Sequence, residues 1–591
     1  MMKKTLCVLA LGIAAAIVNA KTIYVSADSA AGGNGDKDKP FSTIQQGLDA
    51  AMPGDTVELA PGVYHEWVKF PRSGEFGKPI RLNGPRTAII DGVVDFKMNW
   101  KKIPQYGPYA WHTKVPAVFF PKSVRNQGCG LIIAPDGLII QLFEKRVKDT
   151  KSRKNDKRTT WYAPSLMTKG IGKSGFSFIK ALGMYRHKKS DVIVAFGDGR
   201  DVSKVGMKFA PPIPSITIDG VDRCVVSGIT IRHSYKGVLI KNSVGSVVED
   251  CRILRSDRGV ELAEGGDRCT VRFCEISMDS IFRANPRLKG GWEAWQGHKR
   301  GGYWDRIAIN IVNSVGGHQI HDNYLHNHWG GVQDCISQTN PKVDYNICLN
   351  VHHNRIDEIE DDGLEPTGGE RECRWHHNYV TRSRCGFRIK NFYYGPMYAY
   401  ANVFFDNTED FRNFRNSDNP EAICFVYHNT SNTKAAVNNN KVAPNPGVKN
   451  FHYFNNIFVC DKIYGGTDAL NWQDAGNVYI CRTPAQLWQD TLLKAKNAGF
   501  KSSSKFIDKP VHGVKDFAKG DFSLNADSPA IKAGIDLSKY ALPGVDEFKN
   551  RDAGAVESGK PMFKTYRKKS EVKCPEAGFW PAEGSKLTLK K

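Results

Sequence analysis

Beyond its first twenty residues, the sequence has no unbroken apolar run of about 18 residues, the length that a membrane-spanning helix needs. None of its 14 cysteines forms a Cys-x-x-Cys pair, so the usual spacing of a zinc site is missing. The leucine pattern of leucine-rich repeats is absent as well. We therefore expect no membrane insertion, no zinc site and no leucine-rich solenoid.

The first twenty residues have the pattern of a secretory signal peptide. Lys3 and Lys4 precede an apolar stretch at residues 6–18, and Val18-Asn19-Ala20 offers small residues for cleavage. We predict that the mature chain begins at Lys21 and is secreted or periplasmic. An odd number of cysteines remains after cleavage, and we expect mostly buried thiols with a few disulfide bridges.

Acidic residues are in the minority, because 83 Lys and Arg residues stand against 61 Asp and Glu residues and give a formal net charge of +22. Such an excess favours anionic partners. For a secreted chain this predicts an anionic polysaccharide, such as a uronate-containing or sulfated glycan, rather than nucleic acid. The alternative is a generically basic surface with no dedicated partner. We expect a monomer.

A short pattern recurs from residue 225 onward, in segments such as VVSGITI, VVEDCRIL, IHDNYLH and WHHNYVT. Most of these segments lie 23 to 31 residues apart, and one step of 49 is explained by an insertion. Val, Ile and aromatic residues bounded by Gly, Asn and Asp predict short strands and turns. The aligned central residues, which we expect to stack and to hydrogen-bond along one axis, are Gly228, Cys251, Cys274, Asn323, Asn354, Asn378, Asn402, Asn429 and Asn456.

This pattern resembles the right-handed parallel β-helix of pectate-lyase-like secreted proteins, an all-β solenoid. The stretch IYVSADSAAGGNGDKDKPFSTIQQGLDAAMPGDTVELAPGVYHEWV is similar to the opening of many bacterial β-helix carbohydrate enzymes. It contains a predicted capping helix with Ser42 and Gln45 as a capping box. Segments between residues 105 and 214 break the rhythm and predict antiparallel strands. Some β-helix glycoside hydrolases, which the chain resembles, carry a comparable β-sandwich-like insertion.

The resulting division of the chain has six parts. We predict a signal peptide at residues 1–20, an N-terminal cap with the first coils at 21–104, an inserted β-rich domain at 105–214, the main β-helix at 215–465, C-terminal coils at 466–560 and a basic tail at 561–591.

A second alignment concerns the stretch IEDDGLEPTGGE, which has five carboxylates in twelve residues. Successive coils contain a glycine-led strand, as in GVELA, GVQDC, GLEPT and GFRIK. Because strand side chains alternate between two faces, the apolar second residue points to the core and the third to solvent. The third residues predict one outward column of Leu239, Glu261, Gln333, Glu365, Arg388 and Arg412.

Paired carboxylates beside basic residues are what acid/base hydrolysis of a glycosidic bond uses. We therefore predict a glycoside hydrolase with Glu365 as acid/base and Asp362 as nucleophile or water activator. Asp361 and Glu261 are the alternates, with Glu261 two coils from Glu365. Charges that only pair across strands are the structural alternative. The predicted substrate-binding residues are Glu261, Gln333, Arg388, Lys390, Arg412, Trp292 and Trp295.

Two other functions remain open. The stretch GLEP…GFRIK is similar in outline to β-helix alginate and chondroitin lyases, and this resemblance implies Arg388 or Lys390 as the base. Asp361, Asp362 and Glu365 would then be Ca²⁺ ligands; the hydrolase needs no cofactor. A lysine that those lyases carry after their glutamates is missing, because TGGE occupies the place. The third function is a non-catalytic glycan-binding surface protein.

Paired histidines also recur, at His352 with His353 and at His376 with His377. Paired histidines in adjacent coils can bind a metal ion. We favour a structural role, in which they stack from coil to coil.

Overall fold

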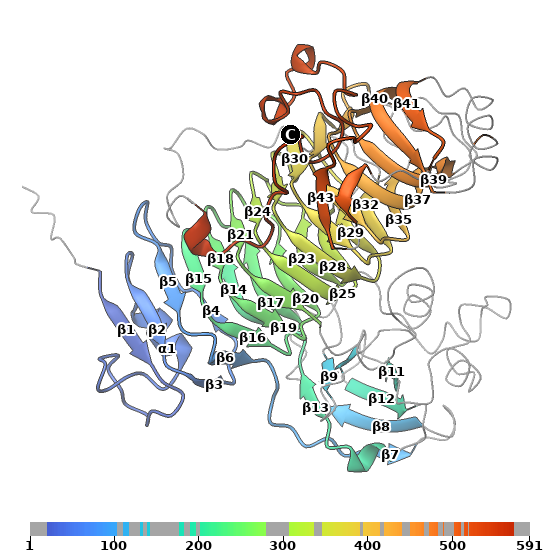
Figure 1. The fold of residues 1–591 in the computed structure, drawn as a ribbon. Coiled ribbons are helices and arrows are strands. Elements are labelled where there is room, and N and C mark those ends of the chain that lie inside the picture. Colours follow the sequence, from blue (N-terminus) through green and yellow to red (C-terminus); the bar gives the residue numbers. More distant parts are fainter. Residues whose placement is uncertain are drawn as a thin grey trace, which may run out of the picture.

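The computed structural model describes 17 stretches of the chain, which are residues 20–102, 110–116, 131–133, 139–141, 177–182, 190–196, 201–278, 306–335, 345–390, 394–413, 419–439, 450–465, 472–482, 489, 502–509, 513–517 and 519–572. The predicted signal peptide lies outside the described residues, apart from Ala20. Figure 1 shows an elongated stack of strands that runs from the N-terminal coils to those near residue 500.

The stack is a parallel β-helix with three sheets, because each coil adds one strand to each sheet and pairs in parallel with the coil before it. The first sheet contains β1 (Thr22–Val25), β2 (Thr56–Leu59), β5 (Ile80–Asn83), β15 (Cys224–Ser227), β18 (Val247–Glu249), β21 (Thr270–Arg272), β24 (Gln319–His321), β27 (Asn350–His352), β30 (Cys373–His376), β33 (Met397–Tyr400), β36 (Cys424–Tyr427), β38 (Phe451–Phe454) and the start of β40 (Trp472–Cys481). The second contains β3 (Gly62–Tyr64), β6 (Ala88–Asp91), β16 (Thr230–Arg232), β19 (Arg252–Leu254), β22 (Glu275–Ser277), β25 (Tyr324–His328), β28 (Arg355–Ile359), β31 (Tyr379–Thr381), β34 (Val403–Phe405), β37 (Thr430–Asn439), β39 (Ile457–Gly465), the end of β40 and β41 (Ser503–Ile507). The third contains β4 (Val68–Lys69), β14 (Pro214–Asp219), β17 (Lys236–Lys241), β20 (Arg258–Leu262), β23 (Ile307–Val312), β26 (Gly330–Cys335), β29 (Asp362–Glu365), β32 (Cys385–Ile389), β35 (Glu409–Asn413) and the ends of β37 and β39.

The predicted parallel β-helix is therefore confirmed, and its right-handedness stays a prediction. Its core is one continuous apolar cluster from Ile23 to Cys481, to which each coil contributes inward side chains from all three sheets. Burial of this apolar surface is the main force that holds the coils together. The step of 49 residues is a single coil with an insertion, because β22 pairs directly with β25.

The asparagine ladder forms at the corner between the first and second sheets. From Asn323 onward, each side chain donates to the amide oxygen of the next asparagine at 2.9–3.0 Å, through Asn456 and on to Asn477. The same oxygen accepts a main-chain N–H, as from Asn354 to Asn378 at 3.1 Å. From Asn323 onward, the ladder gives hydrogen-bond partners to buried main-chain N–H groups at this turn, as the alignment predicts.

The helix α1 (Ile44–Ala50) packs against β1, β2 and β4. Its N-cap is Thr43, whose hydroxyl accepts from the N–H of Gln46, so the predicted capping box of Ser42 and Gln45 is wrong. The Glu66 carboxylate accepts from the N–H groups of Ile44 and Gln45 instead. A carboxylate from a distant part of the chain thus completes the N-cap of α1, whereas the local spacing of residues predicts that a neighbouring side chain does so.

Two small antiparallel sheets lie between residues 101 and 210. One contains β7 (Lys101–Lys102), β8 (Ala110–Val115), β11 (Ser177–Leu182) and β12 (Ser190–Phe196), and the other β9 (Leu131–Ile133), β10 (Ile139–Gln141) and β13 (Lys208–Ala210). A 3₁₀ turn, Val202–Lys204, precedes β13. The predicted antiparallel strands are present, whereas the boundaries of the six predicted parts stay predictions.

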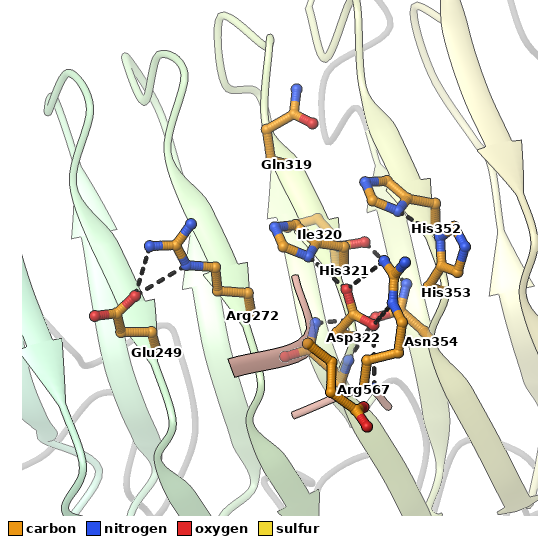
Figure 2. Close-up of polar contacts among 12 residues, drawn as sticks. Glu249, Arg272, Gln319, Ile320, His321, Asp322, His352, His353, Asn354 and Arg567 are labelled. Atoms are coloured by element: carbon orange, nitrogen blue, oxygen red, sulfur yellow. Dashed lines mark hydrogen bonds and ion pairs between the residues drawn. The ribbon is translucent and has the colours of Figure 1, made fainter. Parts of the chain in front are cut away.

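The chain end runs back along the β-helix. The hairpin of β42 (Val514–Asp516) and β43 (Asp521–Leu524) is followed by the 3₁₀ turns Ser538–Tyr540, Val545–Glu547 and Lys569–Glu571. From Phe563 to Lys569 the chain contacts progressively earlier coils, at His377 and His353, then at Asp322 and then at Glu249. Arg567 forms two side-chain hydrogen bonds with the fully buried Asp322, at 2.6 and 2.9 Å (Figure 2). Lys569 pairs with Glu249 at 2.7 Å. We name residues 561–572 the return segment; it contains the described part of the predicted basic tail.

The eleven cysteines in the described part of the chain are all free thiols, and most are buried. The expected disulfide bridges are therefore not found among these residues. Cys251 and Cys274 instead occupy ladder positions before the asparagines begin, and each thiol faces a main-chain oxygen of the preceding coil at 3.7 Å. In the described ranges, no helix has the length and apolar character to cross a membrane.

Candidate functional site

The predicted column of third residues lies on the third sheet. Its register pairs Leu239 with Glu261, Glu261 with Asn310, Asn310 with Gln333, Gln333 with Glu365 and Arg388 with Arg412. The residue that precedes each of these in the chain is apolar and belongs to the core, as Leu364 does before Glu365. The column exists as predicted, with Asn310 as one additional member.

Asn310 comes from β23, which reads IAINIV and has no leading glycine. It places Glu261 three strands from Glu365, not two as expected. At the usual strand spacing this is about 14 Å, which is beyond the separation of an inverting carboxylate pair. Glu261 is therefore wrong as an alternate partner for Glu365.

The column is not open to solvent as expected. Glu261 and Glu365 are each only 5% exposed and Gln333 is 9% exposed. Long basic side chains from neighbouring strands lie against these residues, since Lys390 contacts Glu365 and Lys236 contacts Glu261 at 2.5 Å. The alternation of a strand predicts that a side chain leaves the core, but not which other side chains cover it.

Glu365 is the most perturbed acid of the column. Burial, and then the negative charge of Asp362, raise the pKa of its carboxyl to about 8, although Lys390 and Arg388 oppose the shift. The same contact keeps Lys390 charged: its pKa is lowered by burial but raised overall by Glu365. Glu365 is thus a carboxylic acid that holds its proton near neutral pH, beside an ammonium group.

Asp361 and Asp362 lie at the start of β29 and face two arginines of β32 and its preceding turn. Arg388 donates to the Oδ2 atom of Asp362 at 2.5 Å, and Arg384 binds Asp361. Arg388 also lies 3.5 Å from Asp361. The Asp362 side chain is fully buried, whereas that of Asp361 is 13% exposed. We name Asp361, Asp362, Glu365, Arg384, Arg388 and Lys390 the third-sheet cluster.

Arg412 continues the cluster toward the C-terminal coils. It donates to Glu409 at 2.6 Å, and Glu409 also lies 3.7 Å from Arg384. The most exposed basic side chain here is Lys390, at 29%. A ligand that approaches this face from solvent therefore meets positive charge before it meets the carboxylates.

Glu261 belongs to a separate group on the same sheet. It contacts Lys236, Arg258 and the amide of Asn310, while Arg306 binds Asp257 beside it. Burial raises the pKa of Glu261, but the two cations more than offset it and lower the pKa to about 2. Glu261 is consequently a firmly ionised, ion-paired group.

The calcium interpretation finds no support in the geometry. In the part of the chain that the structure describes, no three His, Cys, Asp or Glu side chains are arranged to hold a metal ion. Asp361, Asp362 and Glu365 each contact a guanidinium or an ammonium group instead. A calcium site needs those oxygens to face one cation.

The paired histidines stack from coil to coil, as the structural interpretation predicts. The rings of His321, His352 and His376 lie 4.9 Å apart in one column, and His353 and His377 form a second column at 4.9 Å. Burial lowers the pKa of His353 to about 3, so it is neutral at ordinary pH. Phe563 of the return segment covers His353 and His377.

The sequence patterns did not predict some residues of this region. Arg384 precedes β32 and Glu409 is the first residue of β35, so both fall outside the column, although the DD pair opposite Arg384 is a usable signal. Asn310 lacks the glycine that marks the other strands. The predicted residues Trp292 and Trp295 lie outside the described residues.

Fold and site together define a parallel β-helix protein with a buried cluster of carboxylates and cations on one sheet. No model of a known protein family matches the sequence. One curated relative, the uncharacterized protein YwoF of Bacillus subtilis (strain 168), is 40% identical over 58 residues, which span 10% of this chain and 12% of that protein.

Several solved structures share the fold. XylC in complex with xylose is 14% identical with a TM-score of 0.44, and the match covers 82% of each chain. Pectate lyase Pel9A is 13% identical with a TM-score of 0.40, over 91% of this chain and 96% of that chain. The PL6 family alginate lyase AlyGC is 11% identical with a TM-score of 0.40, over 95% of this chain and 59% of that chain. At these values the likeness concerns the fold alone.

Proposed function

We propose that the protein is a secreted polysaccharide-degrading enzyme that hydrolyses an acidic glycan at the third-sheet cluster. The observation that carries the proposal is a pair of acids in different environments at the two ends of one strand, β29. Burial and the charge of Asp362 raise the pKa of Glu365 to about 8, and Asp362 forms an ion pair with Arg388 at 2.5 Å. Glycosidic hydrolysis requires one protonated and one ionised carboxyl group.

In this mechanism Glu365 is the general acid. It gives its proton to the oxygen of the leaving sugar as the glycosidic bond breaks. Asp362 is the carboxylate that attacks the anomeric carbon or activates a water molecule for that attack, with Asp361 as the alternate. Arg388, which contacts both aspartates, positions them and keeps a positive charge beside them.

The cations around the acids support an acidic substrate. Lys390, Arg388 and Arg412 are the partly exposed basic side chains of this face, at 29%, 14% and 13%. A uronate or sulfate group that binds Lys390 draws the ammonium away from Glu365. This step uncovers the acid only when a charged sugar is present, and it selects against neutral glycans.

The reaction type is tested by the products from a panel of acidic and neutral polysaccharides. Hydrolysis releases reducing ends without a gain in ultraviolet absorbance, whereas elimination by a lyase gives unsaturated ends that absorb near 235 nm. Reducing ends from an acidic glycan alone are the expected result. Unsaturated products contradict the hydrolase, and neither signal on any glycan contradicts an enzyme.

The site is tested by Glu365→Gln, which keeps the shape of the side chain and removes its proton donor. We expect at least a roughly hundredfold fall in kcat, as for loss of a general acid. Glu264→Gln is the matched control, because Glu264 is an exposed third-sheet neighbour that only pairs with Lys241 at 3.3 Å. Unchanged turnover in Glu365→Gln removes the proposed site.

A further inference from the structure

The outer face of the second sheet carries a stripe of side chains that the proposed reaction does not use. In register across three neighbouring strands lie Tyr324 of β25, Arg355 of β28 and Tyr379 of β31. The Arg355 guanidinium lies 5.8 Å from the ring centre of each tyrosine. We name these three residues the tyrosine–arginine stripe; β25 and β28 lie side by side in the stack (Figure 1).

The stripe is accessible and has an unmatched positive charge. Arg355 is exposed and both tyrosines are half-buried. Among the described residues, none forms an ion pair with Arg355, whereas the nearby Asp357 and Glu358 both contact Arg382. The two carboxylates closest to the stripe are thus already matched by another cation, and Arg355 remains available to an anion.

A second observation concerns Asp357, which lies in the column beside the stripe and is only 3% exposed. Its Oδ2 atom binds Arg382, and its Oδ1 atom has no hydrogen-bond donor within the described part of the chain. A buried acceptor without a donor is uncommon in folded proteins. The hydroxyl group of a sugar is a donor of the kind that this oxygen lacks.

We propose that the tyrosine–arginine stripe is a non-catalytic binding surface for an acidic oligosaccharide, separate from the third-sheet cluster. The ring of Tyr324 is stacked on His326 at 4.2 Å and that of Tyr379 packs against Phe522, so a sugar meets the exposed edges of the two tyrosines. A carboxylate or sulfate of the sugar between them binds Arg355. The strand spacing of about 4.8 Å is close to the length of one sugar ring, so one sugar falls on each strand. This surface keeps a polymer on the protein while another part of it reaches the cluster.

The test is affinity electrophoresis of the Glu365→Gln protein through native gels that contain polygalacturonate, alginate or heparin, with dextran as the neutral reference. We expect retardation in at least one acidic gel, and a roughly tenfold higher dissociation constant after Arg355→Ala or Tyr324→Ala. Arg374→Ala is the matched control, since Arg374 is an exposed arginine on the first sheet and should bind as the parent does.

Three results overturn the proposal: equal binding by Arg355→Ala, equal weakening by Arg374→Ala, or equal retardation in dextran. Arg355→Gln, which keeps a polar side chain but removes the charge, should weaken binding as Arg355→Ala does. Equal thermal midpoints establish that the variants are folded. Because the assay measures binding by a protein without its proposed general acid, its outcome is independent of whether the third-sheet cluster cleaves glycans.

Discussion

At the scale of single residues, the charges around Glu365 determine the pH at which the proposed acid works. Its pKa of about 8 results from burial and from Asp362 and Asp361, against Lys390 and Arg388. A general acid must be protonated, so kcat is expected to fall as the pH rises through about 8. Lys390→Met removes a charge that favours ionisation and should move this limb to higher pH. A limb that stays in place in Lys390→Met contradicts the role of Glu365.

A second pair of acids affects stability rather than catalysis. Asp334 and Glu370 are both fully buried. Burial raises the pKa of Asp334 to about 6, and burial together with the charge of Asp334 raises that of Glu370 well above its ordinary value. The fold therefore favours the neutral forms, and this stabilisation is complete below the unfolded-state pKa of about 4 and is lost as the pH rises through about 6.

We accordingly expect this pair to lower the free energy of unfolding, measured with urea, between about pH 4 and about pH 7, against the buried histidines such as His353, whose lowered pKa makes stability rise with pH. Asp334→Asn leaves one acid in place of two and should flatten this dependence. Asp49→Asn, a change at an exposed helix residue, should leave it unaltered. The same dependence on pH in the parent protein and in Asp334→Asn contradicts a raised pKa at Asp334 and Glu370.

At the scale of elements, the asparagine ladder is the polar counterpart of the apolar core. Asn378 accepts the main-chain N–H of Asn354 at 3.1 Å and donates to the main-chain oxygen of Val351 at 2.9 Å. Asn378→Ala leaves both groups buried without partners and should lower the free energy of unfolding by about 3 kcal/mol. Asn350→Ala, at a half-buried strand residue, should cost less than about 1 kcal/mol. Similar urea midpoints for the two variants contradict a special role of the ladder.

The elements also show what the sequence could reveal. The ladder asparagines and the glycine-led strands repeat at a coil length, so they predict the β-helix and the column that contains Glu365 and Arg388. The strand of Asn310 was missed because it lacks that glycine. The burial of Glu365 was missed because it depends on Lys390, whose side chain reaches back across the strands. The alternation of side chains along a strand does not predict which side chain from another strand covers Glu365.

At the scale of the whole molecule, the return segment joins parts of the chain that no repeat connects. Arg567 binds Asp322 across 245 residues and Lys569 binds Glu249 across 320. These contacts have no periodic signature, which is why the sequence predicts only a basic tail here. They close the corner that contains the ladder and the stacked histidines (Figure 2).

Arg567→Ala tests this closure. Among the described residues, it leaves the fully buried Asp322 with His321, at 2.8 Å, as its one side-chain partner, and burial lowers the pKa of that histidine. We expect a loss of about 3 kcal/mol in the free energy of unfolding, because a buried charge without its partner is costly. Faster amide exchange in β24 and β27 should accompany it. Lys564→Ala, at a side chain that is 76% exposed, is the control and should change neither measurement.

The return segment also sets an order of events for a chain that emerges from the ribosome N-terminus first. The coils around Glu249 and Asp322 are made early, yet Lys569 and Arg567, which bind them, follow 320 and 245 residues later. A nascent chain interrupted before the return segment therefore presents Asp322 without its arginine and the rings of His353 and His377 without Phe563, whereas Glu249 keeps Arg272. Translation of the return segment is what covers these groups, so a product truncated before it exposes a chemically different surface at this corner.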